Sequence, residues 1–171
     1  VNVSLSDDLV DAFEVNDIRR NWVGTFSDAG TGNTYFYPFK YKAMIQGQGS
    51  ALTEYSMVFR LAEQYLIRAE ARANQGDLSG SQSDVNTIRN RAGLSNTTAN
   101  DLSSLLSAIE QERRIELFSE RGHRWLDLKR TRRADEVLST INPDWQATDV
   151  WYPIPESEIQ SNPNMTQNDG Y

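Results

Sequence analysis

The chain has 171 residues, a length typical of one domain, and no run of apolar residues in it is long enough to cross a bilayer. Its 17 basic and 24 acidic residues give a net charge of −7, which argues against binding nucleic acid or an anionic membrane. The absence of Cys excludes disulfides and thiolate catalysis, and a single His leaves almost no material for a metal site. We therefore expect no metal and no cofactor.

The composition divides the chain into three zones, which we expect to belong to one domain. Residues 1–51 are rich in Gly and polar clusters, and they predict a short helix near Leu9–Phe13 followed by loops or short strands. Residues 52–141 have apolar positions at helical spacing and form the predicted core of helix pairs. Residues 142–171 contain four of the five prolines and many Asn, which predicts an irregular, packed tail.

The first helix pair is predicted by one continuous apolar stripe. From Leu52 to Ala73, including Tyr55 and Phe59, apolar residues recur three and four positions apart. Gly76 supplies the left-handed stop, and Asp77 or Ser79 is the expected cap of a second helix. That helix is expected to end near Gly93.

A second pair is expected from Leu102 to Leu138. Asn100 or Asp101 is positioned to cap a third helix, which runs to Phe118 and is weakened by Gly122 before a fourth helical segment. The predicted fold is therefore all-α, with tetratricopeptide-like antiparallel helix pairs, long irregular loops and an extended C-terminal tail.

Opposite charges are dense between residues 110 and 130. Three pairs stand three or four positions apart, as helical ion pairs do: Glu110 with Arg114, Arg113 with Glu116, and Glu120 with Arg124. Glu112 and Glu116 together also suit the general acid–base work of a glycosidase. Neighbouring Arg lowers the pKa of a carboxyl group, however, which does not suit a general acid at neutral pH. We interpret the six charged residues as a partly buried structural ladder.

Aromatic residues in the first zone are the candidate ligand-binding residues. Trp22, Tyr35 and Tyr37 lie in a stretch rich in Gly and hydroxyl groups, and Asn33 lies beside them. Flat rings next to polar groups on loops suit the faces and hydroxyl edges of sugars. Packing in a small satellite core is the alternative for the same side chains.

Aromatic residues near the C-terminus have a different expected role. Trp125 falls in a helical stripe, which predicts a core position. Trp151 and Tyr152 precede Pro153, and the fixed backbone of that segment predicts that both rings pack against the body of the protein.

Five segments in sequence resemble one known family. They are RLAEQYLIRAEA (60–71), VNTIRNRAGL (85–94), the charged stretch 109–130, WYPIPE (151–156) and NPNMTQNDGY (162–171). DIRR (17–20) is a weaker element that precedes them. In this order they resemble the SusD/RagB family over about residues 54–171.

This resemblance implies a fold, a place and a role. Members are mostly helical, non-catalytic lipoproteins exposed on the outer membrane of Bacteroidetes-type bacteria. They capture glycans, or in some branches peptides, and pass them to a SusC-like TonB-dependent transporter. We expect glycan capture for this chain; the alternatives are a peptide-capturing member and a helical scaffold that binds protein alone.

Two departures from the family pattern matter. Members are far longer and carry an acylated Cys at the mature N-terminus, whereas this chain has no Cys. The chain is therefore similar to the carboxy-terminal part of a member, and we expect the lipid anchor and an N-terminal part of the same protein to lie outside it. No binding residue of the family transfers cleanly to a numbered position here.

Overall fold

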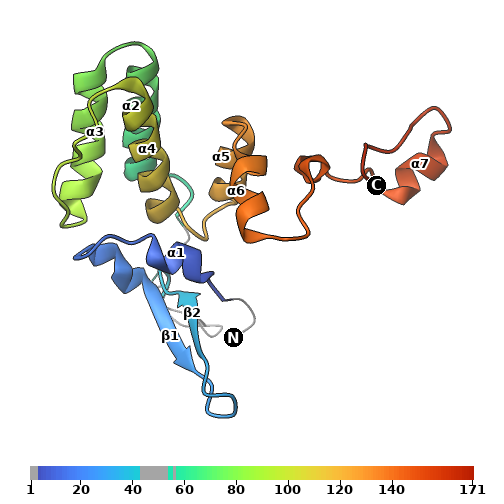
Figure 1. Cartoon of the computed structure of the whole chain (residues 1–171), viewed down its shortest axis with the longest axis horizontal. Coiled ribbons are helices and arrows are strands. Elements are labelled where there is room, and N and C mark those ends of the chain that lie inside the picture. The colour runs from blue at the N-terminus through green and yellow to red at the C-terminus, as the bar shows by residue number, and fades with distance from the viewer. Residues whose placement is uncertain (1–3, 43–53, 56) are drawn as a thin grey trace. The chain divides into compact units, whose positions relative to one another are not determined.

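The computed structural model of the protein describes residues 4–42, 54–55 and 57–171. They fall into two compact units, residues 1–121 and residues 122–171, and each unit is described by itself (Figure 1). The described residues are mostly helical, as predicted, and they also contain one two-stranded sheet.

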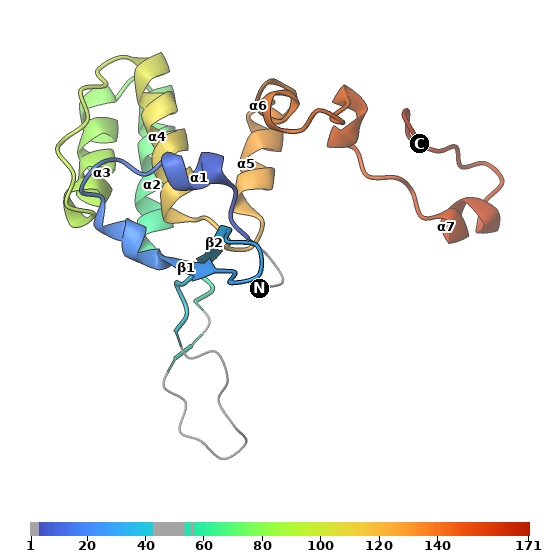
Figure 2. The same cartoon turned by 60° about the horizontal axis from the view of Figure 1, so that its bottom comes forward.

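The first unit begins with short elements and continues with three long helices. In chain order they are α1 (Asp7–Asp11), the 3-10 helix η1 (Ile18–Trp22), β1 (Val23–Ser27), β2 (Thr34–Pro38), α2 (Leu61–Asn74), α3 (Leu78–Arg91) and α4 (Leu102–Glu116). The helices α2, α3 and α4 pack against one another, and both views show them side by side (Figures 1 and 2).

Small and branched apolar residues build the core between these helices. One cluster joins all three helices and consists of Ala69, Ala73, Val85, Leu105 and Ile109. A second cluster joins α2 to α3 through Ala62, Leu66 and Ile88. The Ala side chains let the helix backbones approach closely, which is the packing that the apolar stripe predicted.

Local signals set the ends of these helices. Gly76 and Gly93 have positive φ angles of 85° and 78°, the left-handed conformation in which glycine is favoured. The Asp77 carboxylate accepts a hydrogen bond from the backbone N–H of Gly80, and Asp101 caps α4 in the same way. Of the alternative caps offered by the sequence, the two aspartates are the ones used.

The start of α2 differs from the prediction. The helix begins at Leu61, because Arg60 has an extended backbone and ends the helical geometry on that side. Tyr55 and Phe59 therefore precede the helix and are exposed, although their spacing fits its stripe. Leu52 lies outside the described residues. The C-terminal end of α4 also differs from the prediction, because this helix ends at Glu116, two residues before Phe118.

The grouping of helices also differs from the expected two pairs. Helix α4 packs on α2 and α3 in the first unit, whereas the fourth helical segment belongs to the second unit, so the hairpin expected over residues 102–138 stays a prediction. The tetratricopeptide-like character of the α2–α3 pair stays a prediction.

The strands β1 and β2 form an antiparallel hairpin with Val23 opposite Pro38 and Ser27 opposite Thr34. Because side chains alternate along a strand, Tyr35 and Tyr37 point to one face while Phe36 points to the other. Phe36 packs with Trp22 and Phe118 in a small core beneath the hairpin. Tyr37 lies opposite Gly24, where a Cβ atom would collide with its ring.

The second unit contains α5 (His123–Arg130), α6 (Ala134–Ile141), the 3-10 helix η2 (Ala147–Val150) and α7 (Glu156–Ser161). Only Asp127, Leu128 and Ala134 are buried in this unit. Trp151 and Tyr152 are 59% and 65% exposed, and the expectation that both rings pack against the body of the protein stays a prediction.

None of the helices in the described residues has both the length and the apolar composition that crossing a membrane requires.

Candidate functional site

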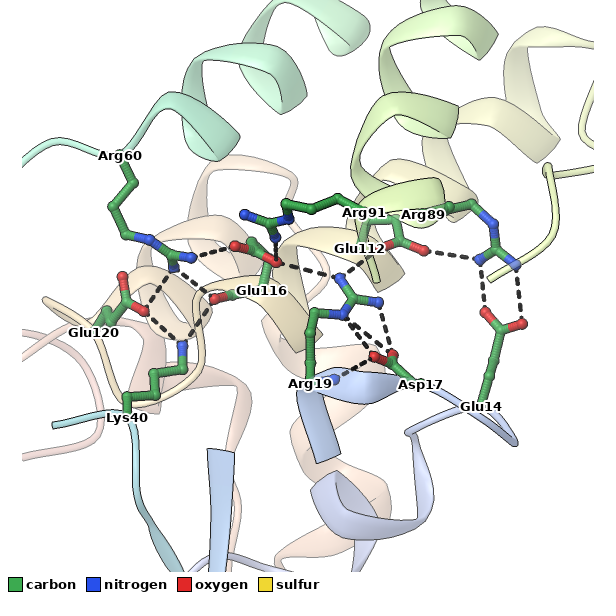
Figure 3. Close-up of polar contacts among 10 residues, drawn as sticks. All are labelled: Glu14, Asp17, Arg19, Lys40, Arg60, Arg89, Arg91, Glu112, Glu116 and Glu120. Atoms are coloured by element: carbon green, nitrogen blue, oxygen red, sulfur yellow. Dashed lines mark hydrogen bonds and ion pairs between the residues drawn. The ribbon is translucent and has the colours of Figure 1, made fainter. Parts of the chain in front are cut away.

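A buried arginine is the centre of the polar network in the first unit (Figure 3). Arg19 lies in η1 and is 2% exposed. Its Nε donates to the Asp17 carboxylate at 2.9 Å, and its Nη1 donates to Glu112 of α4 at 2.8 Å. Asp17 also caps η1 by accepting from the Arg19 backbone N–H. One side chain thereby attaches the segment before the hairpin to the helix bundle.

The two carboxylates of α4 that face this arginine are surrounded by guanidinium groups. Glu112 accepts from Arg19 and from Arg89 of α3, each at 2.8 Å. Glu116 is fully buried and pairs with arginines from three other segments of the chain: Arg19, Arg60 and Arg91. Both carboxylates are thus already bonded to cationic donors, in short charge-assisted hydrogen bonds.

The electrostatics of the network follow from these contacts. Burial alone would lower the pKa of the Arg19 guanidinium, but its hydrogen bonds to Asp17 and the charge of Glu112 raise that pKa above its ordinary value. At the edge of the network Arg89 donates to both oxygens of Glu14, at 2.6 and 2.9 Å. These hydrogen bonds hold the pKa of the Glu14 carboxyl below its ordinary value.

This arrangement is suited to joining segments. A general acid needs a proton at neutral pH and access to substrate, whereas Glu112 and Glu116 are buried among arginines. Charge pairs of this kind fix which segments lie together, even where their net contribution to stability is modest.

The six residues of the predicted ladder have different surroundings. Glu116 and Glu120 pair with Arg60, which lies 56 and 60 positions away in the chain. Arg114 pairs with Asp8 before the hairpin. Arg113 is buried in α4 and Glu110 is half-buried there, whereas Arg124 belongs to the second unit. Long-range partners, in addition to helical spacing, therefore determine the positions of these charges.

Lys40 connects the network to the surface. Its Nζ donates to the Glu120 carboxylate at 2.6 Å and to the Glu116 carbonyl at 2.8 Å. The same atom lies 4.1 Å from the ring centroid of Phe118 and 5.0 Å from that of Trp22, within cation–π range. Burial lowers the pKa of Lys40 to about 8, although the hydrogen bond to Glu120 acts in the opposite direction.

A cavity of about 400 Å³ lies beside Lys40, which is in the size range of small-ligand sites. We call it the Lys40 pocket. It combines aromatic and apolar side chains with charged ones, and its lining consists of Trp22, Lys40, Tyr41, Glu54, Tyr55, Met57, Arg60 and Glu120. The Tyr41 hydroxyl accepts a hydrogen bond from the Met57 backbone N–H at 3.1 Å, which fixes one wall.

The structure separates the four candidate ligand-binding residues into two places. Trp22 lines the Lys40 pocket, but the Lys40 ammonium and the Arg60 guanidinium lie within 5.0 and 5.6 Å of its ring centroid. Tyr35 and Tyr37 are on the face of the hairpin opposite the small core, and Asn33 precedes β2 in the exposed turn. The Asn33 side-chain amide lies 3.5 Å from the Tyr35 hydroxyl.

An aromatic stripe leads from the hairpin toward the pocket. Phe26 lies opposite Tyr35 and both rings are exposed. Tyr37 contacts Phe39 edge to face, with 6.0 Å between ring centroids. Tyr41, two residues further along the chain, lines the Lys40 pocket. Exposed and half-buried rings that follow one another along a hairpin can stack on an extended ligand.

The sequence analysis missed most of the pocket. Trp22 is the pocket residue that was predicted from the sequence, and Tyr41 also has a usable signal, because it belongs to the same aromatic run as Tyr35 and Tyr37. Lys40 and Arg60 have no local feature that distinguishes them from surface residues.

In the part of the chain that the structure describes, no three His, Asp or Glu side chains are grouped as metal ligands.

Comparison with known proteins places this chain in one family. The model of the SusD family matches residues 11–171, and the chain belongs to this family. It is 35% identical over 124 residues to SusD-like protein P38 of Formosa agariphila, an alignment that covers 67% of this chain and 24% of that protein. It is 38% identical over 131 residues to starch-binding protein SusD of Bacteroides thetaiotaomicron, covering 67% of this chain and 21% of that one.

Solved structures of SusD superfamily proteins are similar to this chain in fold. A SusD superfamily protein of Parabacteroides distasonis is similar with a TM-score of 0.73 and 25% identity, over 98% of this chain and 42% of that one. Surface glycan-binding protein A of Bacteroides thetaiotaomicron is similar in fold with a TM-score of 0.70, at 24% identity, over 97% and 41% of the two chains. The chain spans about a quarter of the length of the two curated relatives. The family predicted from the sequence segments is confirmed.

Proposed function

We propose that this chain is part of a non-catalytic glycan-capture protein, and that it binds the glycan along the aromatic stripe and in the Lys40 pocket. The observation that supports this proposal best is the pocket itself, where Tyr41 and Tyr55 stand beside Glu54 and Arg60. Rings of this kind stack on the apolar faces of sugars, while carboxylate and guanidinium groups bond their hydroxyls. The relatives named as starch-binding and glycan-binding support the same ligand class.

Capture without catalysis agrees with where the acidic residues lie. The two carboxylates that suited a glycosidase, Glu112 and Glu116, are buried among arginines and do not line the pocket. Glu120 does line the pocket, but Lys40 and Arg60 both donate to it. The oxygen of Glu120 that both cations contact is therefore already engaged in hydrogen bonds within the protein.

The remaining parts of the proposal come from the family resemblance. We place the whole protein on the outer-membrane surface, held by a lipid anchor outside this chain, where it delivers glycan to a SusC-like TonB-dependent transporter. Co-purification from outer membranes with a large barrel protein is the expected result. A complex that forms while every glycan fails to bind would instead favour the scaffold that binds protein alone.

Substitution of Tyr41 by Ala tests the pocket. We expect affinity for a bound neutral oligosaccharide to fall by about tenfold or more, because the variant loses a fixed stacking wall. Phe59→Ala is the matched control, since Phe59 is an exposed aromatic residue outside the pocket lining. Calorimetry against a glycan panel and a peptide digest measures both variants.

Tyr35→Ala and Tyr37→Ala test the stripe in the same experiment. We expect both variants to retain binding of short oligosaccharides and to lose retardation by long polysaccharides in native gels, because the stripe extends the contact. Unchanged affinity for Tyr41→Ala, or heat released by peptides alone, overturns the proposed glycan site.

A further inference from the structure

The second unit contains an aromatic cluster that the proposed site does not use. The Nζ atom of Lys129 lies 5.2, 5.9 and 5.5 Å from the ring centroids of Trp125, Trp151 and Tyr152. Trp125 also contacts Tyr152 edge to face, with 6.1 Å between the centroids. We call these four residues the Lys129 cluster. All four lie in one compact unit, so the cluster is defined within it.

The charge of Lys129 is not neutralised within the cluster. In the described residues its ammonium group contacts the three rings and has no carboxylate within ion-pair distance. The nearest acidic residue on its helix, Asp127, accepts from Arg130 at 2.8 Å. Asp135 accepts from the Trp145 indole at 3.0 Å. Local carboxylates are thus bonded elsewhere, and the ammonium keeps its capacity to pair with an anion.

The backbone that carries the exposed rings is held in place. The Gln167 side chain both accepts from and donates to the backbone of Ile154, at 2.7 and 2.9 Å. Asn168 donates to the Tyr152 carbonyl at 2.7 Å, and the Tyr171 hydroxyl donates to the Trp151 carbonyl at 2.9 Å. The rings therefore stand on a fixed segment, which reduces the entropy lost when a ligand binds.

Two large rings that are more than half exposed on a fixed backbone, beside an unpaired ammonium, have the composition of a binding surface. We infer that the Lys129 cluster binds an anionic saccharide, with its sugar ring on Trp151 and Tyr152 and its acidic group on Lys129. The saccharide part of this inference rests on the proposed glycan capture. The preference for an anion rests on Lys129 and is independent of the Lys40 pocket.

Oligogalacturonate and its methyl ester are a suitable pair of probes, because esterification removes the charge and keeps the sugar. We expect the unmodified chain to bind the acid form more tightly than the ester. Lys129→Met is expected to weaken binding of the acid form by about tenfold or more and to leave ester binding unchanged. Trp151→Ala is expected to weaken binding of both forms, since stacking does not depend on charge.

Arg132→Gln is the matched control, because it removes one positive charge from an exposed position outside the cluster. It is expected to leave both affinities unchanged. Far-UV circular dichroism and thermal midpoints establish that each variant is folded. Added acetate is expected to leave saccharide binding intact, whereas strong competition by acetate would mean a site for small anions and would overturn the saccharide assignment.

Other outcomes separate this inference from the proposed function. Binding of neutral glycans that depends on Tyr41, with no binding of oligogalacturonate, overturns the Lys129 site alone. Failure to bind any saccharide overturns both. Resistance of Trp151 to acrylamide quenching in the intact protein, measured as the difference from Trp151→Phe, would show that another surface covers the cluster and would also overturn the inference.

Discussion

The two units differ in how they surround Arg19 and Trp22 on one side and Trp151 and Tyr152 on the other. In residues 1–121, Arg19 is buried between three carboxylates, and Trp22 packs beside the hairpin under Lys40 and Arg60. In residues 122–171, Trp151 and Tyr152 are exposed, and no residue after Ala134 is buried. Residue type alone therefore does not tell whether an arginine or an aromatic side chain is enclosed by the fold or open to solvent. That depends on whether neighbouring helices and strands provide side chains that contact it.

The largest expected effect tests the buried network. Glu116→Gln removes the buried carboxylate that pairs with Arg19, Arg60 and Arg91. Three guanidinium groups each lose one ion pair, although Arg19 keeps Asp17 and Arg60 keeps Glu120. We expect the free energy of unfolding to fall by about 3–5 kcal/mol, measured by urea denaturation.

The control for that variant is Glu136→Gln in the second unit, where an exposed carboxylate pairs with Arg133 three residues away. No measurable change is expected, because water screens such pairs. Equal denaturation midpoints for the two variants would contradict the expectation that the buried Glu116 contributes more to stability than the exposed Glu136.

A smaller effect is expected from the apolar core. Leu105→Ala leaves a cavity between α2, α3 and α4, where the side chain is completely buried. The expected loss is about 2–5 kcal/mol. Leu126→Ala provides the comparison, since this side chain on α5 is largely exposed and its loss should leave the unfolding midpoint unchanged. A destabilising Leu126→Ala would indicate that another surface covers α5.

Lys40 predicts a dependence of stability on pH. Its pKa is lowered by burial to about 8 from an ordinary value of 10.5, so the unfolded chain binds more protons than the folded one between these values. The cost of burying the ammonium is fully present below pH 8 and is relieved as the pH rises. We expect the wild type to gain up to about 3 kcal/mol relative to Lys40→Met across this window. Parallel stability curves for the two proteins would contradict this reading.

The smallest effect is expected at the edge of the network. The pKa of Glu14 is lowered by its hydrogen bonds from Arg89, so its contribution to stability is present above its ordinary value of 4.5 and disappears as the pH falls through the folded pKa. Since the side chain is about half exposed, Glu14→Gln should cost less than about 1 kcal/mol at pH 7. Denaturation at pH 7 and in acid checks whether the difference vanishes at low pH.

Local sequence signals predicted the helices well because helix ends depend on near neighbours. Gly76, Gly93 and Asp101 act within one turn of their own positions, and the Ala stripe of α2 requires only a regular spacing. The same reasoning placed the start of α2 too early. Tyr55 and Phe59 fit the stripe by spacing, but periodicity does not register that the backbone is extended at Arg60.

The site was less predictable because its parts are distant in the chain. Arg19 and Glu112 are 93 positions apart, and nothing near either residue identifies the other. Trp22 and Tyr35 looked equivalent as aromatic residues in a polar loop. The structure shows that the cationic groups of Lys40 and Arg60 lie over the ring of Trp22, whereas the side chain of Tyr35 is exposed. Family resemblance identified the scaffold and left these roles open.

Gly24 leaves the space on the hairpin that the ring of Tyr37 fills. Its lack of a side chain lets the ring of Tyr37 lie across bare backbone of β1. One added methyl group at position 24 would push that ring aside and tilt part of the stripe, although every aromatic residue would still be present. A substitution at position 24 would therefore reshape the aromatic face of the hairpin through a residue that has no ring of its own.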